Sequence, residues 1–282
     1  RRFQELEKKF KQKDITNFIK NLNEHGFGNK KNMFKSGVDF GIKSKNNNLK
    51  THYTYFGRTK SKVLANKLES SIKTNNRKKF IDKKLTKSVD YNLKYVYFPL
   101  HIDQERTTLI ETPFYTNQIE FIRNIVKSLP IDHVLYAKEH PTQSMRHWRS
   151  KEWYEEVMEI PNLTLIHPDI SSQKLIENCS LLITISGTAA LEAAFLQKPS
   201  ITFIDSDYTK IDSIERVKSI EELPKMIRKS IKKKITSEDL DRYVSLKENY
   251  AFDYNAEDFH QSSLNKFYHG GQLVDVDIMN ED

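Results

Sequence analysis

From residue 91 onward, short apolar runs alternate with stretches in which apolar residues recur every three or four positions. The runs predict buried strands and the stretches predict amphipathic helices. The predicted strands are, in chain order, 94–100, 133–139, 163–167, 181–186 and 199–205. The predicted helices are 116–129, with Thr116 as its N-cap, 149–160, 171–179, 188–197 and 219–231. Because strand and helix alternate over short connections, we expect a parallel sheet with helices on both faces, a Rossmann-like α/β domain.

The chain on either side of this region has a different pattern. Residues 1–90 contain few apolar positions, with helical signals over Phe3–Leu22 and Ser61–Lys73 and a predicted loop at 43–50. The stretch Thr236–His269 predicts two helices, followed by a polar tail. We therefore expect three parts, namely a basic, mostly helical accessory or incomplete N-terminal region (1–90), the Rossmann-like domain (91–235) and C-terminal helices with a tail (236–282).

Charge divides the chain at the same place. Residues 1–90 hold 24 lysines and arginines against 8 aspartates and glutamates, a net charge of +16, and the remainder holds 22 against 30, a net charge of −8. The basic part is either a solvated surface or a face for anionic membrane lipid, polyanionic glycan or nucleic acid. No RNA-binding signature or zinc-ligand spacing is present, so a specific nucleic-acid partner is not expected.

The single cysteine, Cys179, excludes an intramolecular disulfide framework and suits a reducing compartment. No apolar run approaches the roughly 20 residues of a membrane span, and no signal peptide is evident. The first residue is not methionine and falls inside a predicted helix, which is typical of a fragment of a longer protein. We expect a cytoplasmic protein, peripheral at the inner membrane face if the basic region meets anionic lipid.

In a parallel α/β sheet, ligands bind outside the carboxyl ends of the strands, so the residues that follow each strand are the candidate site. After the fourth strand, Ser186-Gly187-Thr188 leads directly into a helix. Gly187 allows close approach of the backbone to a ligand, and the start of the helix with its two hydroxyls favours a phosphate. Glu192, one turn further on, is placed to accept hydrogen bonds from ribose hydroxyls. The alternative is an ordinary capped helix after a tight turn.

The second strand ends in Lys138-Glu139-His140-Pro141. A histidine at this edge can donate to a phosphate oxygen, a charge-assisted bond of roughly 1.5–3 kcal/mol. Pro141 fixes the turn that holds the imidazole, and Lys138 adds positive charge to the same rim. Taken alone, the tetrapeptide is equally typical of a surface turn.

Other candidate residues carry weaker signals. The GxGxxG and Walker patterns are absent, which argues against NAD and ATP, and no cofactor is expected. The histidines at 101, 133, 147 and 167 lack metal-ligand spacing, and Asp205-Ser206-Asp207 is predicted to be a solvated loop, so no metal site is expected. Trp148 and Trp153, with Arg146 and Arg149, either stack on a base or sugar or pack their helix against the sheet. Tyr208 is a candidate border of the base pocket.

Several segments together resemble the capsule polysaccharide biosynthesis family, which includes bacterial Kdo transferases of capsule export. They are YFPLHIDQERTT, LYAKEHP, NLTLIHPDISSQKLIENCSLLITISGTAALEAAFLQKPSITF and Tyr208, spread over about 115 residues from Tyr95 to Tyr208. The resemblance implies a domain like the C-terminal nucleotide-sugar domain of GT-B glycosyltransferases. It implies that His140-Pro141 contacts the nucleotide phosphate and that Ser186, Thr188 and Glu192 complete the donor site. Gln104 and Glu105 match the polar pair on the first loop.

The activity implied by this resemblance is transfer of a sugar from a nucleotide-activated donor, with CMP-Kdo as the first choice, to a glycan or glycolipid acceptor. Glu105 or Asp103 is the candidate base that deprotonates the acceptor hydroxyl. His140, Lys138 and the helix that begins near Thr188 stabilise the leaving phosphate, which makes a metal unnecessary.

Two other functions stay open at this point. One is a nucleotide-sugar 2-epimerase or a polymer glycerophosphotransferase, which use similar folds. The other is a module that binds a nucleotide sugar or glycan without catalysis, with the basic region recruiting a partner.

Overall fold

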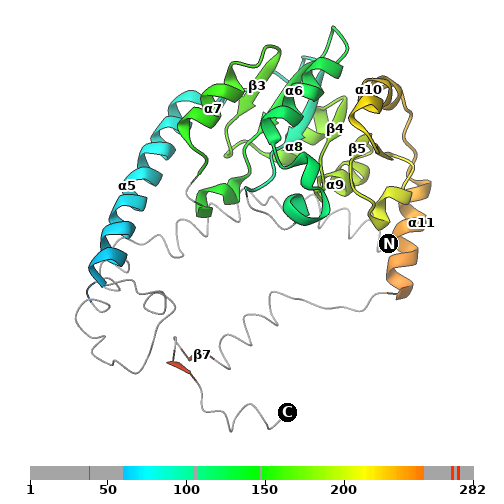
Figure 1. Cartoon of the computed structure of the whole chain (residues 1–282). Helices are drawn as coiled ribbons and strands as arrows, with labels where there is room; N and C mark the ends of the chain where they lie inside the picture. Colours follow the sequence, from blue (N-terminus) through cyan, green and yellow to red (C-terminus); the bar gives the residue numbers. More distant parts are fainter. Residues whose placement is uncertain are drawn as a thin grey trace. The chain divides into compact units, whose positions relative to one another are not determined.

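The sheet consists of six parallel strands in the computed structural model, which describes residues 38, 60–103, 107–146, 148–250, 268–269 and 272–273. The strands are β1 (Tyr95–Pro99), β2 (Val134–Lys138), β3 (Leu163–Ile166), β4 (Leu181–Ile183), β5 (Ser200–Thr202) and β6 (Ile214–Arg216). Their order across the sheet is β3-β2-β1-β4-β5-β6. Figure 1 labels β3 on one side of the sheet and β4 and β5 on the other. The predicted parallel α/β sheet is therefore confirmed.

This strand order is doubly wound. The chain moves outward from β1 to β3 and then returns to the other side of β1 as β4. In the register, Tyr97 of β1 lies opposite Tyr136 of β2 on one side and Leu182 of β4 on the other. The point of reversal between β1 and β4 is where folds of this type open a crevice at the carboxyl edge.

Helices cover both faces, as predicted. They are α6 (Gln118–Ser128), α7 (Lys151–Met158), α8 (Ser172–Asn178), α9 (Ala189–Phe195) and α10 (Leu223–Ile231). Short helical turns are η1 (Thr107–Glu111), η2 (Pro113–Tyr115), η3 (Pro141–Arg146), η4 (Asp207–Lys210) and η5 (Ile220–Glu222). The N-cap of α6 is Asn117, whose side chain accepts from the Glu120 amide at 3.3 Å, and not Thr116 as expected. Thr116 instead ends η2.

Alternation along β1 divides the core into two layers. Val96 and Phe98 pack with apolar residues of α6, α7 and α10, whereas Tyr95 and Tyr97 pack with α8 and α9 on the other face. All four side chains are fully buried. Because successive strand residues point to opposite faces, a strand covered on both sides must be apolar at every position, which is why β1 appears as an unbroken apolar run.

The predicted and observed elements differ in three places. The predictions missed β6, because it has only three residues and only Ile214 is buried. The helix predicted over 61–73 is α5 (Lys60–Lys84), eleven residues longer at its end. The segment 236–269 contains α11 (Glu238–Tyr250), and its last two residues form β7 (Tyr268–His269), which pairs with β8 (Gln272–Leu273). The helical signal over Phe3–Leu22, the predicted loop at 43–50 and the second C-terminal helix lie outside the described residues.

The end of α5 is part of the core of the sheet domain. Ile81 and Leu85 are buried in the layer that contains α6 and α7. The Thr86 amide donates to the Leu165 carbonyl at 3.0 Å, and the Thr86 carbonyl accepts from the His167 amide at 2.9 Å, beside β3. None of the helices in the described ranges has the length and apolar character of a membrane span.

Truncation of a core residue on α5 tests this packing. Ile81→Ala should lower the free energy of unfolding by about 2–5 kcal/mol, because it removes buried apolar contacts and leaves a cavity. Ile72→Ala, at a position 62% exposed on the same helix, should change it by no more than about 0.5 kcal/mol. Urea titrations followed by circular dichroism measure both. Small effects from both variants would contradict the assignment of Ile81 to the core.

Candidate functional site

The loops that follow β1 and β4 meet through a buried histidine. Nε2 of His101 accepts a hydrogen bond from the Ile185 amide at 3.1 Å and lies 3.1 Å from Oγ1 of Thr184. Because an amide can only donate, Nε2 carries no proton, and the neutral ring is protonated on Nδ1. His101 therefore joins the ends of the two strands at which the strand order reverses.

Gly187 lies against this histidine. A Cβ at Gly187 would be 2.8 Å from Oγ1 of Thr184 and 3.4 Å from Cε1 of His101. The Gly187 amide also donates to Oγ1 of Thr184 at 3.0 Å, and the Tyr208 hydroxyl donates to the Gly187 carbonyl at 3.4 Å. Packing within the protein thus requires glycine here, whether or not a ligand also approaches it.

Ser186 and Thr188 lie on either side of Gly187, between the end of β4 and the start of α9. Oγ of Ser186 is buried and has no hydrogen-bond partner in the described part of the chain. Thr188 is exposed at the start of α9, which has only seven residues. A buried hydroxyl without a partner is costly, by about 1–3 kcal/mol, so this turn has hydrogen-bonding capacity that the described residues leave unused.

The charge of Lys138, on β2, acts on the carboxyl group of Glu192, on α9. Lys138 is only 2% exposed, and its Nζ donates to Oγ of Ser172 at 2.7 Å. Burial raises the pKa of Glu192 above its ordinary value, while a hydrogen bond with Thr188 and the charge of Lys138 act in the opposite direction. Lys138 therefore places a positive charge beneath the rim and not on it.

His140 is held in one orientation by the turn that it opens. Its Nδ1 accepts from the Thr142 amide at 3.2 Å and lies 2.6 Å from Oγ1 of Thr142, and Pro141 begins η3. Since Nδ1 accepts from a backbone amide, the neutral imidazole carries its proton on Nε2. The ring thus has a fixed N–H donor, the form that a phosphate-binding histidine requires.

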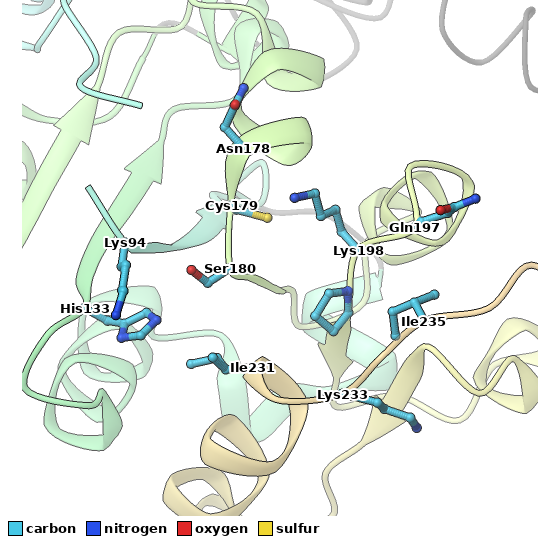
Figure 2. Close-up of a pocket in the computed structure, with 11 residues that line it drawn as sticks. Lys94, His133, Asn178, Cys179, Ser180, Gln197, Lys198, Ile231, Lys233 and Ile235 are labelled. Atoms are coloured by element: carbon cyan, nitrogen blue, oxygen red, sulfur yellow. The ribbon is translucent and has the colours of Figure 1, made fainter. Parts of the chain in front are cut away.

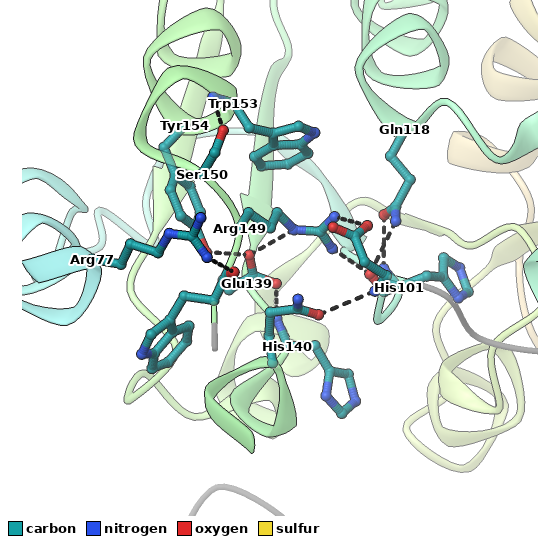
Figure 3. Close-up of polar contacts among 12 residues, drawn as sticks. Arg77, His101, Gln118, Glu139, His140, Arg149, Ser150, Trp153 and Tyr154 are labelled. Carbon is teal, nitrogen blue, oxygen red and sulfur yellow. Dashed lines mark hydrogen bonds and ion pairs between the residues drawn. The ribbon is translucent and has the colours of Figure 1, made fainter. Parts of the chain in front are cut away.

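Glu139, between these residues, belongs to a buried ionic network that the sequence did not indicate. Its exposure is 0%, and Oε2 accepts from Nε of Arg149 at 2.8 Å and from the Tyr154 hydroxyl at 2.7 Å. Oε1 accepts from the His140 amide at 2.8 Å (Figure 3). Both oxygens of the Glu139 carboxylate are therefore engaged in hydrogen bonds that hold the end of β2 in place.

The same arginine holds the loop after β1. Nη1 of Arg149 pairs with the Asp103 carboxylate, and Nη2 donates to the His101 carbonyl (Figure 3). The Gln118 side chain accepts from the His101 amide at 2.9 Å and donates to its carbonyl at 3.0 Å, and Oε1 of Gln143 accepts from the Asp103 amide at 3.1 Å. Asp103, the alternative base, is thus an ion-pair partner of Arg149. Gln104 and Glu105 lie outside the described residues.

The tryptophans pack as the second of the two sequence interpretations predicted. Trp148 is buried in the core with φ of 60°. Trp153 packs against the core, and the Arg149 guanidinium lies over its ring, 4.3 Å from the ring centroid.

The remaining candidate residues are also engaged within the protein. Tyr208 is buried, and its hydroxyl donates a hydrogen bond to the Gly187 carbonyl. Asp205 pairs with Arg216 at 2.6 Å. In the described ranges no group of histidine, cysteine or carboxylate side chains is arranged to hold a metal.

The strand order and the helices on both faces define a doubly wound α/β protein, with polar side chains gathered at the carboxyl edge of its sheet. Residues 36–210 match the family described as capsule polysaccharide biosynthesis protein, and the chain belongs to that family. No curated protein sequence matches it.

Solved structures with similar folds share little sequence with this chain. A UDP-GlcNAc 2-epimerase from Methanocaldococcus jannaschii, in complex with UDP-GlcNAc and UDP, is 19% identical, with a TM-score of 0.40 over 62% of this chain and 49% of that one. The Thermosulfurimonas dismutans KpsC beta Kdo 2,7 transferase is 12% identical, with a TM-score of 0.39 over 61% and 53%. The chain spans about half the length of these proteins.

Loss of the buried arginine tests the network. Arg149→Met should lower the free energy of unfolding by about 3–5 kcal/mol, because it leaves the Glu139 carboxylate buried without its counter-charge. The double variant Arg149→Met/Glu139→Gln should lose less free energy of unfolding than the losses in Arg149→Met and Glu139→Gln added together. Arg123→Met, which removes an exposed surface pair with Glu120 and Glu156, is the control and should have little effect. Guanidinium titrations measure all four, and additivity of the buried pair would contradict the coupling.

The link between Lys138 and Glu192 is tested by titration. Lys138→Met should raise the pKa of Glu192 further, because the lysine charge favours the ionised carboxylate. Lys174→Met, an exposed lysine on α8, should leave it unchanged. Carbon-13 NMR of the Glu192 carboxyl group follows both titrations. An unchanged pKa in Lys138→Met would show that the two residues do not interact.

Proposed function

We propose that the chain is a glycosyltransferase of capsule or surface polysaccharide assembly that uses a nucleotide-activated sugar. The observation that carries this proposal is the position of the Ser186-Gly187-Thr188 turn at the reversal point of the sheet, between β1 and β4, in a member of the capsule polysaccharide biosynthesis family. In doubly wound sheets this is where ligands of the nucleotide type bind.

The donor phosphate is proposed to lie between the ends of β2 and β4. These strands are separated by β1 alone, so their carboxyl ends are about 10 Å apart. His140 donates from Nε2 on one side, and the hydroxyls of Ser186 and Thr188 face the phosphate from the other. Lys138, buried beneath them, strengthens the positive potential through space.

Glu192 is the proposed partner of the ribose hydroxyls. It lies one turn into α9, and a carboxylate accepts two hydrogen bonds from a vicinal diol. Burial raises its pKa and so disfavours ionisation, whereas the Lys138 charge favours the ionised form that accepts hydrogen bonds. The Lys138–Glu192 interaction would then strengthen donor binding, because it favours the ionised carboxylate that accepts hydrogen bonds from the ribose.

The proposed reaction is a single displacement. A base removes the proton of an acceptor hydroxyl, whose oxygen forms a bond to the anomeric carbon as the bond from that carbon to the phosphate oxygen breaks. The electron pair stays on the departing nucleotide phosphate, which His140 and Lys138 stabilise. Glu105 is the proposed base, since Asp103 is occupied by Arg149. CMP-Kdo is the first donor to test.

The acceptor is proposed to be a glycan or glycolipid at the inner membrane face. Helix α5, at the end of the basic region, carries nine lysines and arginines against two acidic residues. Each basic side chain close to an anionic lipid surface adds roughly 1 kcal/mol of attraction. A cytoplasmic enzyme with this surface would work beside a lipid-linked acceptor.

Nucleotide binding tests the donor site. One of CMP, CDP, UDP and GDP should raise the melting temperature, since a ligand at 100 times its Kd stabilises by roughly 2.7 kcal/mol. In His140→Ala most of this shift in melting temperature should disappear. In Thr142→Val, which removes the hydroxyl contact with the His140 ring but keeps the ring, a smaller part of the shift should disappear. A thermal-shift screen measures each variant with and without ligand. No shift with any nucleotide would remove the donor site from the proposal.

Transfer from the matching labelled nucleotide sugar to a glycan or glycolipid acceptor tests the activity itself. Product formation that is lost in His140→Ala supports the transferase. Nucleotide binding without transfer to any acceptor would favour a binding module, and interconversion of the free nucleotide sugar would favour an epimerase.

A further inference from the structure

A concave site lies at the amino edge of the sheet, opposite the edge that carries the proposed donor site. It is an open cavity of about 470 Å³, here called the amino-edge pocket, lined by residues that precede β1, β2, β4 and β5 and by the end of α10 (Figure 2). They include Lys94, His133, Ser180, Lys198 and Ile231. No candidate residue of the proposed donor site lines it.

Backbone hydrogen bonds place the polar members of this pocket in a row. The Val134 amide donates to the Lys94 carbonyl at 3.1 Å, and the Ser180 amide donates to the Tyr95 carbonyl at 2.9 Å. Neighbouring strands are about 4.8 Å apart. His133, Lys94, Ser180 and Lys198 therefore follow one another along the edge, in the order β2, β1, β4, β5.

Lys198 enters the pocket from the turn that ends α9. Gln197 has a left-handed backbone, with φ of 54°, and the Lys198 amide donates to the Ala193 carbonyl at 2.8 Å. In Figure 2 its ammonium extends toward Cys179 and Ser180, whereas Lys233 points away. Burial raises the pKa of Cys179 to about 12 and the charge of Lys198 opposes that rise, in agreement with this orientation.

The lining is cationic. It contains three lysines and no carboxylate. Asp132 contacts Lys94 at 2.8 Å from outside the pocket, and Lys233 is engaged by Asp212 and Glu215. Lys198 takes part in no ion pair formed by the described residues.

His133 supplies an unused polar atom beside the lysines. It is 5% exposed, and its Nδ1 donates to the Asp132 carboxylate at 2.8 Å. Its Nε2 is buried and has no partner in the described part of the chain. The C-terminal ends of α8 and α9 also lie at this edge, and the partial negative charge of their last carbonyl groups attracts the lysines. In the described part of the chain, none of these carbonyl groups forms a hydrogen bond with Nε2 of His133.

We propose that the amino-edge pocket binds a phosphate group carried on a small polar body of the size of a sugar. The ammonium groups of Lys94 and Lys198 and the Ser180 hydroxyl would hold the phosphate, and Pro199 and Ile231 provide an apolar wall for the ring. The volume lies within the range of about 300–1,000 Å³ of small-molecule sites, more than phosphate alone fills. This ligand class is a monosaccharide phosphate.

Calorimetric titration with glucose 1-phosphate, inorganic phosphate and glucose at pH 7 tests the site. Glucose 1-phosphate should bind the unmodified chain, phosphate should bind more weakly and glucose should give no heat. Lys198→Met and Lys94→Met should each weaken binding of glucose 1-phosphate about tenfold or more, because each removes a charge-assisted hydrogen bond. Lys229→Met, which removes a lysine outside the lining that pairs with Glu215, is the matched control and should bind normally.

His140→Ala separates this pocket from the proposed donor site and should also bind glucose 1-phosphate normally. The proposal is overturned if neither phosphate probe binds, or if Lys229→Met weakens binding as much as Lys198→Met. Loss of binding in His140→Ala with retention in Lys198→Met would place the ligand at the other edge. Equal affinity for phosphate and glucose 1-phosphate would overturn the sugar part. None of these outcomes depends on whether the chain transfers sugar.

Discussion

The buried ion pair of Arg149 and Glu139 is the interaction on which the carboxyl edge of this protein depends. Two charges removed from water are tolerated only when each is paired and its remaining hydrogen-bonding groups are satisfied. Arg149 meets this condition with three nitrogens directed at three groups, the Glu139 carboxylate, the Asp103 carboxylate and the His101 carbonyl. Because these groups follow two different strands, the loops after β1 and β2 cannot move independently.

Rigidity at this edge has a consequence for the proposed chemistry. His140 follows Glu139 directly, and its amide donates to the same carboxylate that Arg149 holds. Thr142 then fixes the imidazole tautomer. The N–H donor proposed for the donor phosphate is thus oriented before any ligand arrives, and a preorganised donor avoids reorganisation during reaction.

The two edges of the sheet have different polar character. At the carboxyl edge, histidines, hydroxyls and carboxylates are held by hydrogen bonds between loops, around the reversal point of a doubly wound sheet. At the amino edge, lysines gather around the starts of the strands and the ends of helices. Both arrangements follow from one parallel sheet, because every strand contributes one end to each edge. An anionic ligand at either edge therefore meets groups drawn from several separate segments.

The alternation of apolar runs and amphipathic stretches determined most of the fold. Strands buried on both faces give continuous apolar runs, so five of them were predicted, and β6 was missed because a three-residue edge strand with one buried side chain leaves no such signal. The sequence also supplied the chemical types at the strand ends, including His140, Ser186 and Glu192. Only the tertiary structure decided the partners. His101 and Thr184 are 83 positions apart, and the pairing of Glu139 with Arg149 has no local period. Local patterns report which side of an element is buried, whereas tautomers, ion pairs and pockets depend on which distant segments the sheet brings together.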